Sequence, residues 1–266
     1  MDCFLSQASL TQPIEANSNR PQTNLDRNVL LSLLQSYGKH KSLQKARKLH
    51  TEILLQKKEM LHNDIYISNA LISTYVKCGA LGDAKKAFKE IRTRNVVSWN
   101  TLISGYVRGG LYDEALNLFQ KMQELCFHPN AITFACVLKA CANTGSLHMG
   151  EEMHKEVLKL GLLGKNIVVG TALVDMYAKC GELGKAQEVF DKLIEKDVVS
   201  WNALIVGYIQ HGLPHEAMKC FVRMQAENFS PNEATFTCVL KACGILGSIG
   251  MGEEIHTEVL KKHLLE

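Results

Sequence analysis

Apolar residues in this chain recur at the three- and four-residue spacing of amphipathic helices. One apolar stripe lies at Trp99, Leu102, Ile103 and Tyr106, and the next at Ala115, Leu118, Phe119 and Met122. Gly109 and Gly110 separate the stripes, and glycine ends helices because it adopts left-handed conformations at little cost. The pattern predicts two helices joined by a tight turn, and Pro129 closes the segment.

This helix–turn–helix pattern repeats along the chain. VVSWNTLISGY begins at Val96 and VVSWNALIVGY at Val198, a separation of 198 − 96 = 102 residues. The pairs NALISTYVKCG with TALVDMYAKCG, and ITFACVLKACA with ATFTCVLKACG, have the same separation. Between residues 96–130 and 198–232, 19 of 35 positions are identical. The chain is therefore built from an internal repeat.

The 102-residue period divides into three units of 31, 35 and 36 residues. One helix pair of this length cannot bury its apolar face, whereas stacked pairs can. We therefore expect an all-α fold, a right-handed α-solenoid superhelix of about seven helix–turn–helix repeats. The expected units are residues 27–64, 65–95, 96–130, 131–166, 167–197, 198–232 and 233–266.

Composition and charge point to a folded, soluble chain. Hydrophobic residues make up 46% and charged residues 21% of the sequence, and the formal net charge is only +3. The net charge alone therefore does not indicate whether the chain binds nucleic acid. No apolar run approaches the roughly 18–20 residues of a membrane span, so no membrane partner is expected. Residues 1–26 lack a periodic apolar face and are expected to be disordered or a weak targeting segment.

The sequence offers no complete catalytic or metal-binding motif. Its nine cysteines include no CxxC pair and are interpreted as reduced thiols in apolar helical patterns. The triplet HxE occurs at His50, His154 and His256, but the PCxxC segment that completes a zinc deaminase site is absent. The three triplets occupy the same position in units 27–64, 131–166 and 233–266, so they belong to the repeat pattern. We expect no enzyme activity, no metal, no cofactor and no small-molecule substrate.

Unit sequence, length and order together resemble the plant pentatricopeptide repeat. VVSWNTLISGYVRGGLYDEALNLFQKMQELCFHPN is similar to its P type, IVVGTALVDMYAKCGELGKAQEVFDKLIEKD to its short S type, and ITFACVLKACANTGSLHMGEEMHKEVLKLG to its long L type. The order L, S, P, L, S, P, L is similar to the arrays of land-plant organellar RNA-editing factors, without their C-terminal deaminase-like domain. Tetratricopeptide repeats, with 34-residue units, fit these lengths and the Ser-Trp-Asn segments poorly.

The resemblance implies that each P or S unit reads one base of single-stranded RNA, which runs 5′ to 3′ from the N-terminal unit. The fifth and last residues of a unit would select the base, and the pairs are Asn69 with Asn95, Asn100 with Asn130, Thr171 with Asp197, and Asn202 with Asn232. The second residues would pack against bases, and these are Tyr66, Val97, Val168 and Val199. The implied footprint is pyrimidine, pyrimidine, any base, guanine, pyrimidine.

Simpler roles exist for several of these residues. Asn and Asp before a helix are common N-caps, which need no RNA. Val97 and Val199 could be core residues. By contrast, Asn100 and Asn202 lie inside helical patterns, where Asn has poor propensity, so capping does not explain them.

The long units are expected to act as spacers. Their fifth residues are Leu31, Ala135 and Thr237, and neither Leu nor Ala can hydrogen-bond a base edge. Phosphates would be met by scattered Lys and Arg side chains.

We therefore expect a sequence-selective RNA adaptor in organellar RNA processing, in a mitochondrion or chloroplast, acting in editing, splicing or stabilisation with other editing or splicing factors as partners. The alternatives are a scaffold that binds a peptide or helix in the same groove, and a truncated product without function.

Overall fold

The structure, a computed structural model, describes residues 27–56 and 64–261. Over these ranges it consists of helices joined by turns. The helices are α1 (Arg27–Lys39), α2 (Leu43–Gln56), α4 (Ile65–Lys77), α5 (Leu81–Glu90), α6 (Val96–Arg108), α7 (Tyr112–Glu124), α8 (Ala131–Thr144), α9 (Leu147–Lys159), α10 (Ile167–Lys179), α11 (Leu183–Asp191), α12 (Val198–Gln210), α13 (Pro214–Ala226), α14 (Glu233–Leu246) and α15 (Ile249–Lys261). The all-α prediction is confirmed, and the expectation for residues 1–26 lies outside the described residues. None of the described helices is long and apolar enough to cross a membrane.

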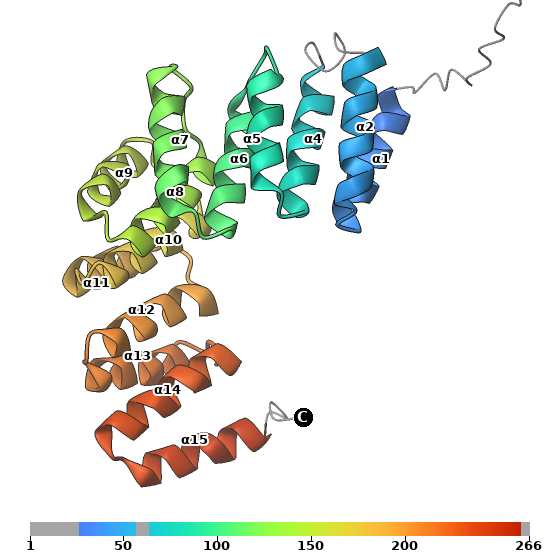
Figure 1. The fold of residues 1–266 in the computed structure, drawn as a ribbon. Coiled ribbons are helices and arrows are strands. Elements are labelled where there is room, and N and C mark those ends of the chain that lie inside the picture. Colours follow the sequence, from blue (N-terminus) through green and yellow to red (C-terminus); the bar gives the residue numbers. More distant parts are fainter. Residues whose placement is uncertain (1–26, 57–63, 262–266) are drawn as a thin grey trace, which may run out of the picture.

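The helices form successive antiparallel pairs that stack into a curved solenoid (Figure 1). We call α1, α4, α6, α8, α10, α12 and α14 the first helices, and the helix that follows each of them its second helix. Each first helix packs on the first helices before and after it, and each second helix also packs on the next first helix. Each pair up to α12–α13 therefore buries apolar surface against the pair that follows it.

Tight turns end the first helices where the sequence predicts them. Gly110, which follows the C-cap Gly109 of α6, has φ +75°, and Gly212 after α12 has φ +72°. These are left-handed conformations, which favour glycine. The helices also approach closely at glycine: a Cβ on Gly105 of α6 would lie 2.7 Å from Val76, and one on Gly207 would lie 2.5 Å from the Cβ of Ala178.

The two tryptophans occupy equivalent places in the core. Trp99 is 1% exposed, and its ring lies edge-on at 4.8 Å from the ring of Phe88 in the preceding pair. Trp201 is 0% exposed and lies 4.5 Å from Phe190 in the same way. Both rings therefore bridge two pairs, and edge-to-face contacts of this kind add to the area that the rings bury.

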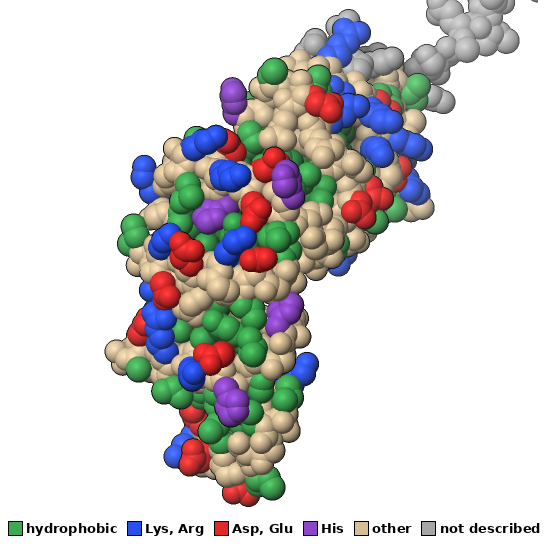
Figure 2. Space-filling model, turned by 90° about the vertical axis from the view of Figure 1, so that its left-hand side faces the viewer, with side chains coloured by type: hydrophobic (Ala, Val, Ile, Leu, Met, Phe, Trp, Pro, Cys, Tyr) green, Lys and Arg blue, Asp and Glu red, His purple; other side chains and the backbone are tan. Residues whose placement is uncertain are grey.

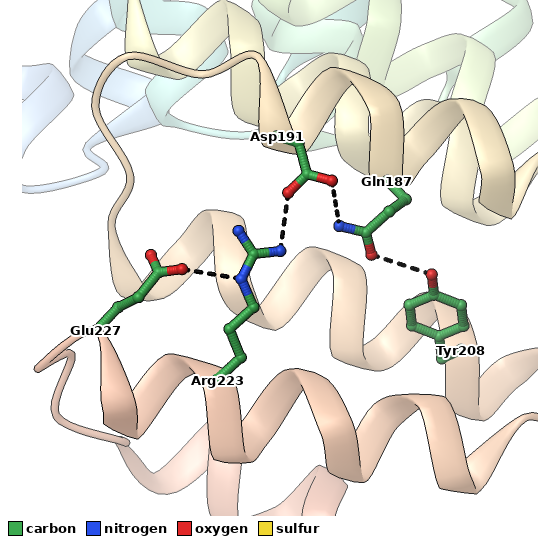
Figure 3. A network of polar contacts seen from close by, with 5 residues as sticks. All are labelled: Gln187, Asp191, Tyr208, Arg223 and Glu227. Atoms are coloured by element: carbon green, nitrogen blue, oxygen red, sulfur yellow. Dashed lines mark hydrogen bonds and ion pairs between the residues drawn. The ribbon is translucent and has the colours of Figure 1, made fainter.

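Polar contacts on the surface also link neighbouring pairs. Figure 3 shows Arg223 of α13 between Asp191 of α11 and Glu227, at 2.8 Å from each carboxylate. Gln187 of α11 donates to Asp191 and accepts from the Tyr208 hydroxyl of α12. The network ties three consecutive helices together.

The face that carries α9 and α11 shows no concentration of one charge. In Figure 2, Lys and Arg side chains are intermixed there with Asp and Glu. Lys185 of α11, for example, pairs with Glu151 of α9 at 2.7 Å. This face therefore offers no electrostatic attraction specific to a polyanion.

Candidate nucleic-acid interface

The second residue of several first helices is an exposed apolar side chain. Their exposed fractions are 66% for Tyr66, 54% for Val97, 62% for Val168 and 61% for Val199. The core interpretation of Val97 and Val199 is therefore wrong. Ile132, the second residue of α8, is equally exposed at 59%; the sequence reasoning missed it because it treated the long units as spacers. The second position of five consecutive first helices, α4 to α12, therefore carries an exposed apolar side chain.

The fifth and last residues of three units are hydrogen-bonded to each other. The amide nitrogen of Asn100 donates to Oδ1 of Asn130 at 2.9 Å. Asn202 donates to Asn232 at 3.1 Å, and Asn69 to Asn95 at 3.4 Å. In each case the last residue belongs to the turn that leads into the next first helix, so the pair bridges two units.

The last residues are also N-caps, as the simpler interpretation expected. Asn95, Asn130, Asp197 and Asn232 cap α6, α8, α12 and α14, each within a capping box. In the Asn130 box, Oδ1 accepts from the backbone N–H of Thr133 at 3.2 Å. Only the amide oxygen can accept a hydrogen bond, so this contact fixes which side-chain atom faces the helix. If one of these asparagines also reads a base, it has to do so with the amide nitrogen, because the amide oxygen is used by the cap.

Capping leaves one end of each last residue without a partner. Oδ1 of Asn130 takes all the contacts of this side chain, and its Nδ2 has no hydrogen-bond partner among the described residues. The same holds for Nδ2 of Asn95 and Asn232. At these three positions, two N–H donors remain available to a ligand.

The Thr171–Asp197 pair is arranged differently. Oδ1 of Asp197 accepts from the backbone of Ser200 at 2.8 Å, and the other carboxylate oxygen has no partner in the described part of the chain. Thr171 makes no bond to Asp197, and its buried hydroxyl oxygen has no partner there either. The threonine side chain is shorter than that of asparagine and offers no amide oxygen, so the Ser200 hydroxyl donates to the Asp197 carbonyl instead. This unit therefore presents a carboxylate oxygen where the others present amide N–H groups.

A groove of about 810 Å³ along α6, α8, α10 and α12 is lined by four of the twelve candidate residues, and the other eight do not line it. Its lining includes Val168, Thr171, Val199 and Asn202, beside the fifth residue of the long unit, Ala135. The sequence placed these residues by unit position alone, and the structure places them in one depression. Base-sized apolar surface and polar groups therefore lie in the same groove.

Basic side chains lie in the last turn of four of the first five first helices, and α8 has none there. The last turns of α1, α4, α6 and α10 carry Lys39, Lys77, Arg108 and Lys179. Lys39, Lys77 and Arg108 line one cavity of about 580 Å³, while Lys179 pairs with Asp175 at 2.9 Å. Gln210 occupies this position in α12. These four basic side chains occupy one unit position, and the expectation that scattered basic side chains meet phosphates stays a prediction.

The fifth residues of the long units offer little to a base. Leu31 packs partly buried against the core. The hydroxyl of Thr237 donates to the carbonyl of Glu233 in its own helix at 2.8 Å. These contacts are compatible with a spacer role.

Two of the three HxE histidines, His50 and His154, lie between helix pairs and do not line the groove, whereas His256 is exposed. Nδ1 of His50 lies 2.9 Å from the Tyr75 hydroxyl, and His154 and Tyr177 form the same contact at 2.9 Å. Burial lowers the pKa of both histidines, and Glu90 beside His50 partly opposes this. Burial therefore favours the neutral form of both imidazoles.

Comparison with known families agrees with this repeat. The profile of the PPR repeat family matches residues 94–143 and 196–244, and that of the PPR repeat matches residues 66–96, 132–162 and 171–198. Together they cover more than half of the chain. The chain belongs to the pentatricopeptide repeat family.

Its relatives include longer pentatricopeptide repeat proteins of Arabidopsis thaliana. A chloroplastic one is 34% identical over 89% of this chain. Another, named chloroplastic/mitochondrial, is 35% identical over 93% of this chain. The chain spans only 38% and 39% of their respective lengths.

Solved pentatricopeptide repeat structures have the same fold. PPR10 from maize, in a crystal structure with an 18-nucleotide psaJ RNA element, superposes with a TM-score of 0.69 at 18% identity. The match covers 86% of this chain and 34% of PPR10. This confirms the α-solenoid prediction.

Proposed function

We propose that this pentatricopeptide repeat chain binds single-stranded RNA sequence-selectively, with one base for each P or S unit. The observation that carries the proposal is the repeated group of an exposed apolar second residue beside a polar pair whose outer groups have no partner. PPR10 is similar in fold and was solved with RNA bound, which supports this ligand class.

The unpaired groups support a particular base at each unit. Asn95, Asn130 and Asn232 offer N–H donors, which match the carbonyl oxygens and the cytosine N3 of pyrimidines. The free oxygen of Asp197 is an acceptor, which matches the N1–H and N2–H donors of guanine. We therefore propose the footprint pyrimidine, pyrimidine, any base, guanine, pyrimidine, with the 131–166 unit as a spacer.

The other contacts would position the strand. Tyr66, Val97, Val168 and Val199 would pack against base faces. The basic side chains of Lys39, Lys77, Arg108 and Lys179 would contact phosphates. Phosphate contacts fix the position of the strand on the protein but do not distinguish one base from another.

We further propose that the chain is a non-catalytic adaptor of the P-L-S kind that acts in organellar RNA processing. C-to-U editing is the leading candidate for this role, followed by splicing or stabilisation. The relatives named chloroplastic or mitochondrial support this setting.

Fluorescence anisotropy tests the binding. A labelled oligonucleotide that contains the footprint is expected to bind at least about tenfold more tightly than its scrambled version, a difference of 1.4 kcal/mol. Asn100→Ala and Asn202→Ala together should reduce the preference several-fold. Equal binding to both oligonucleotides, unchanged by the substitutions, would contradict base reading and favour a peptide-binding scaffold.

A further inference from the structure

The positive charge of the chain is concentrated in units 27–64 and 65–95. Together these units contain 14 Lys and Arg against 5 Asp and Glu, a net charge of +9. The rest of the chain contains 16 Lys and Arg against 22 Asp and Glu, a net charge of −6. The small overall charge of +3 therefore conceals a basic region of the kind that attracts polyanions.

Much of this charge lies on α2 and α5, two second helices that do not line the groove. They are neighbours, because Arg47 of α2 pairs with Asp83 of α5 at 2.7 Å. Six basic side chains on or next to these helices are exposed, and none of them has an ion-pair partner among the described residues. We call them the outer basic surface: Lys45, Lys48, Lys85, Lys86, Lys89 and Arg92.

The spacing of these residues brings like charges together. Lys45 and Lys48 are three residues apart in α2, and Lys85 and Lys89 are four apart in α5. Side chains at these spacings are neighbours on one face of a helix, and like charges there repel and weaken it. Helix stability therefore does not explain the outer basic surface.

The second round of the repeat shows that the fold does not require this charge. The repeat aligns α5 with α11 at a separation of 102 residues, and α2 with α9 at 104, because unit 27–64 is two residues longer than unit 131–166. The residues equivalent to the outer basic surface include no basic side chain and are Met149, Glu152, Gln187, Glu188, Asp191 and Ile194. Even the ion pair between the two helices is kept with its charges exchanged, since Glu151 and Lys185 stand where Arg47 and Asp83 stand, at the same 2.7 Å.

Lys41 connects the outer basic surface with the edge of the first helices. It lies in the turn between α1 and α2 and, with three other basic side chains, lines the cavity of about 580 Å³ at the ends of α1, α4 and α6. No acidic side chain lines this cavity. The φ of Lys41 is +51°, in the left-handed region that favours glycine, and its equivalent is Gly145 with φ +69°. A lysine therefore stands where the backbone favours glycine, four residues before Lys45.

The surrounding side chains indicate the kind of polyanion. Among the described residues of α2 and α5, Leu55 is the one large apolar side chain that is exposed, and no aromatic side chain is exposed. Stacking on bases needs aromatic rings, and membrane-surface helices combine basic residues with Trp, Phe or Leu. Contacts to phosphates need only cations and other hydrogen-bond donors. The outer basic surface therefore fits the phosphate backbone of a nucleic acid better than bases or a membrane.

We propose that the outer basic surface binds the phosphate backbone of an RNA segment outside the groove, in the same RNA whose footprint the groove holds. This inference rests on the proposed function, because binding of the footprint brings the segment to the surface. The contacts add affinity and salt dependence but no base preference, because every nucleotide carries the same phosphate.

Fluorescence anisotropy on the full chain tests this with two oligonucleotides. One contains the footprint alone, and the other carries uridine tails at both ends of it. The tails are expected to strengthen binding at low salt by at least about tenfold and to steepen the slope of log K against log salt by about 2 or more, at about 0.7 for each phosphate contacted.

Two matched triple variants locate the effect. Lys48→Gln, Lys85→Gln and Lys89→Gln together remove three charges from the outer basic surface, and Gln already stands at the equivalent of Lys85. This variant should lose most of the gain from the tails and keep the base preference on the short oligonucleotide. The control, with Lys155→Gln, Lys185→Gln and Lys192→Gln on the equivalent surface of α9 and α11, removes the same charge and should keep the gain.

No gain from the tails, or an equal loss of the gain in both variants, would overturn the proposal. So would sedimentation of the chain with phosphatidylserine vesicles that only the α2–α5 variant abolishes, if the tails add nothing, because the ligand would then be a membrane. Absence of base preference on the short oligonucleotide would contradict the proposed function instead, and that measurement involves no tails.

Discussion

Pairs α6–α7 and α12–α13 stand 102 residues apart and differ in an instructive way. Both have an exposed valine at the second position, a buried tryptophan at the fourth and an asparagine at the fifth that contacts the asparagine at the end of the unit. The last turn of α6 carries Arg108, whereas α12 has Gln210 there. The groups proposed to contact bases are repeated, and the group proposed to contact phosphate is not.

The difference shows that the base-selecting pair and the phosphate-contacting residue that we propose are constrained differently by the fold. The asparagine pair that we propose to face a base is tied into the capping box of the next helix, so its geometry comes with the fold. The basic residue has no such tie, because a last-turn side chain is free to change without disturbing a helix junction. We infer that sequence preference and affinity are adjustable separately in this chain.

The largest expected effect tests whether the two pairs have equivalent cores. Trp99→Ala and Trp201→Ala should each cost about 3–5 kcal/mol of unfolding free energy, since each removes a fully buried ring. Trp99→Phe and Trp201→Phe are the controls and should cost less, because neither Nε1 has a hydrogen-bond partner among the described residues. The sequence has two tryptophans, so urea unfolding of each variant can be followed by the remaining one. If one alanine substitution lowers the unfolding free energy by less than half as much as the other, the two cores are not equivalent.

A smaller effect tests the difference between the pairs. Arg108→Gln should weaken RNA binding and reduce the slope of log K against log salt by about 0.7, the value for one phosphate contact on a single strand. Gln210→Arg should increase the slope by about the same amount. Salt titrations by fluorescence anisotropy measure both. An altered base preference with an unchanged slope would show that this position does not act on phosphate.

The fold was predictable because the repeat supplied its own internal alignment. Gly109–Gly110, the N-cap residues and the stripe through Trp99 each mark a helix boundary or face, and three pairs of segments agree on one period. Local signals and stacking requirements point to the same arrangement, so few alternatives remained.

The candidate site was predictable only in part. Unit position identified Val168, Thr171, Val199 and Asn202, which line the groove, but the choice between capping and base reading for Asn130 depends on which atoms are already used. The missing contact between Thr171 and Asp197 depends on side-chain reach. The exposure of Ile132 depends on how neighbouring pairs pack, and single-unit patterns do not contain it.

The central claim is that capping fixes which group of the last residue faces the base, and exchanging Asp and Asn at that position tests it most directly. Asp197→Asn and Asn232→Asp both preserve a capping oxygen, so the fold should be unchanged, while the outward group changes between acceptor and donor.

The measurement is anisotropy on oligonucleotides that differ at the fourth or fifth base. Asp197→Asn should remove the guanine preference at the fourth base, and Asn232→Asp should favour uracil, which has an N3–H donor, over cytosine, which has none. Each shift is expected to be about tenfold, or 1.4 kcal/mol. Unchanged preferences, or equal weakening on every oligonucleotide, would contradict the account.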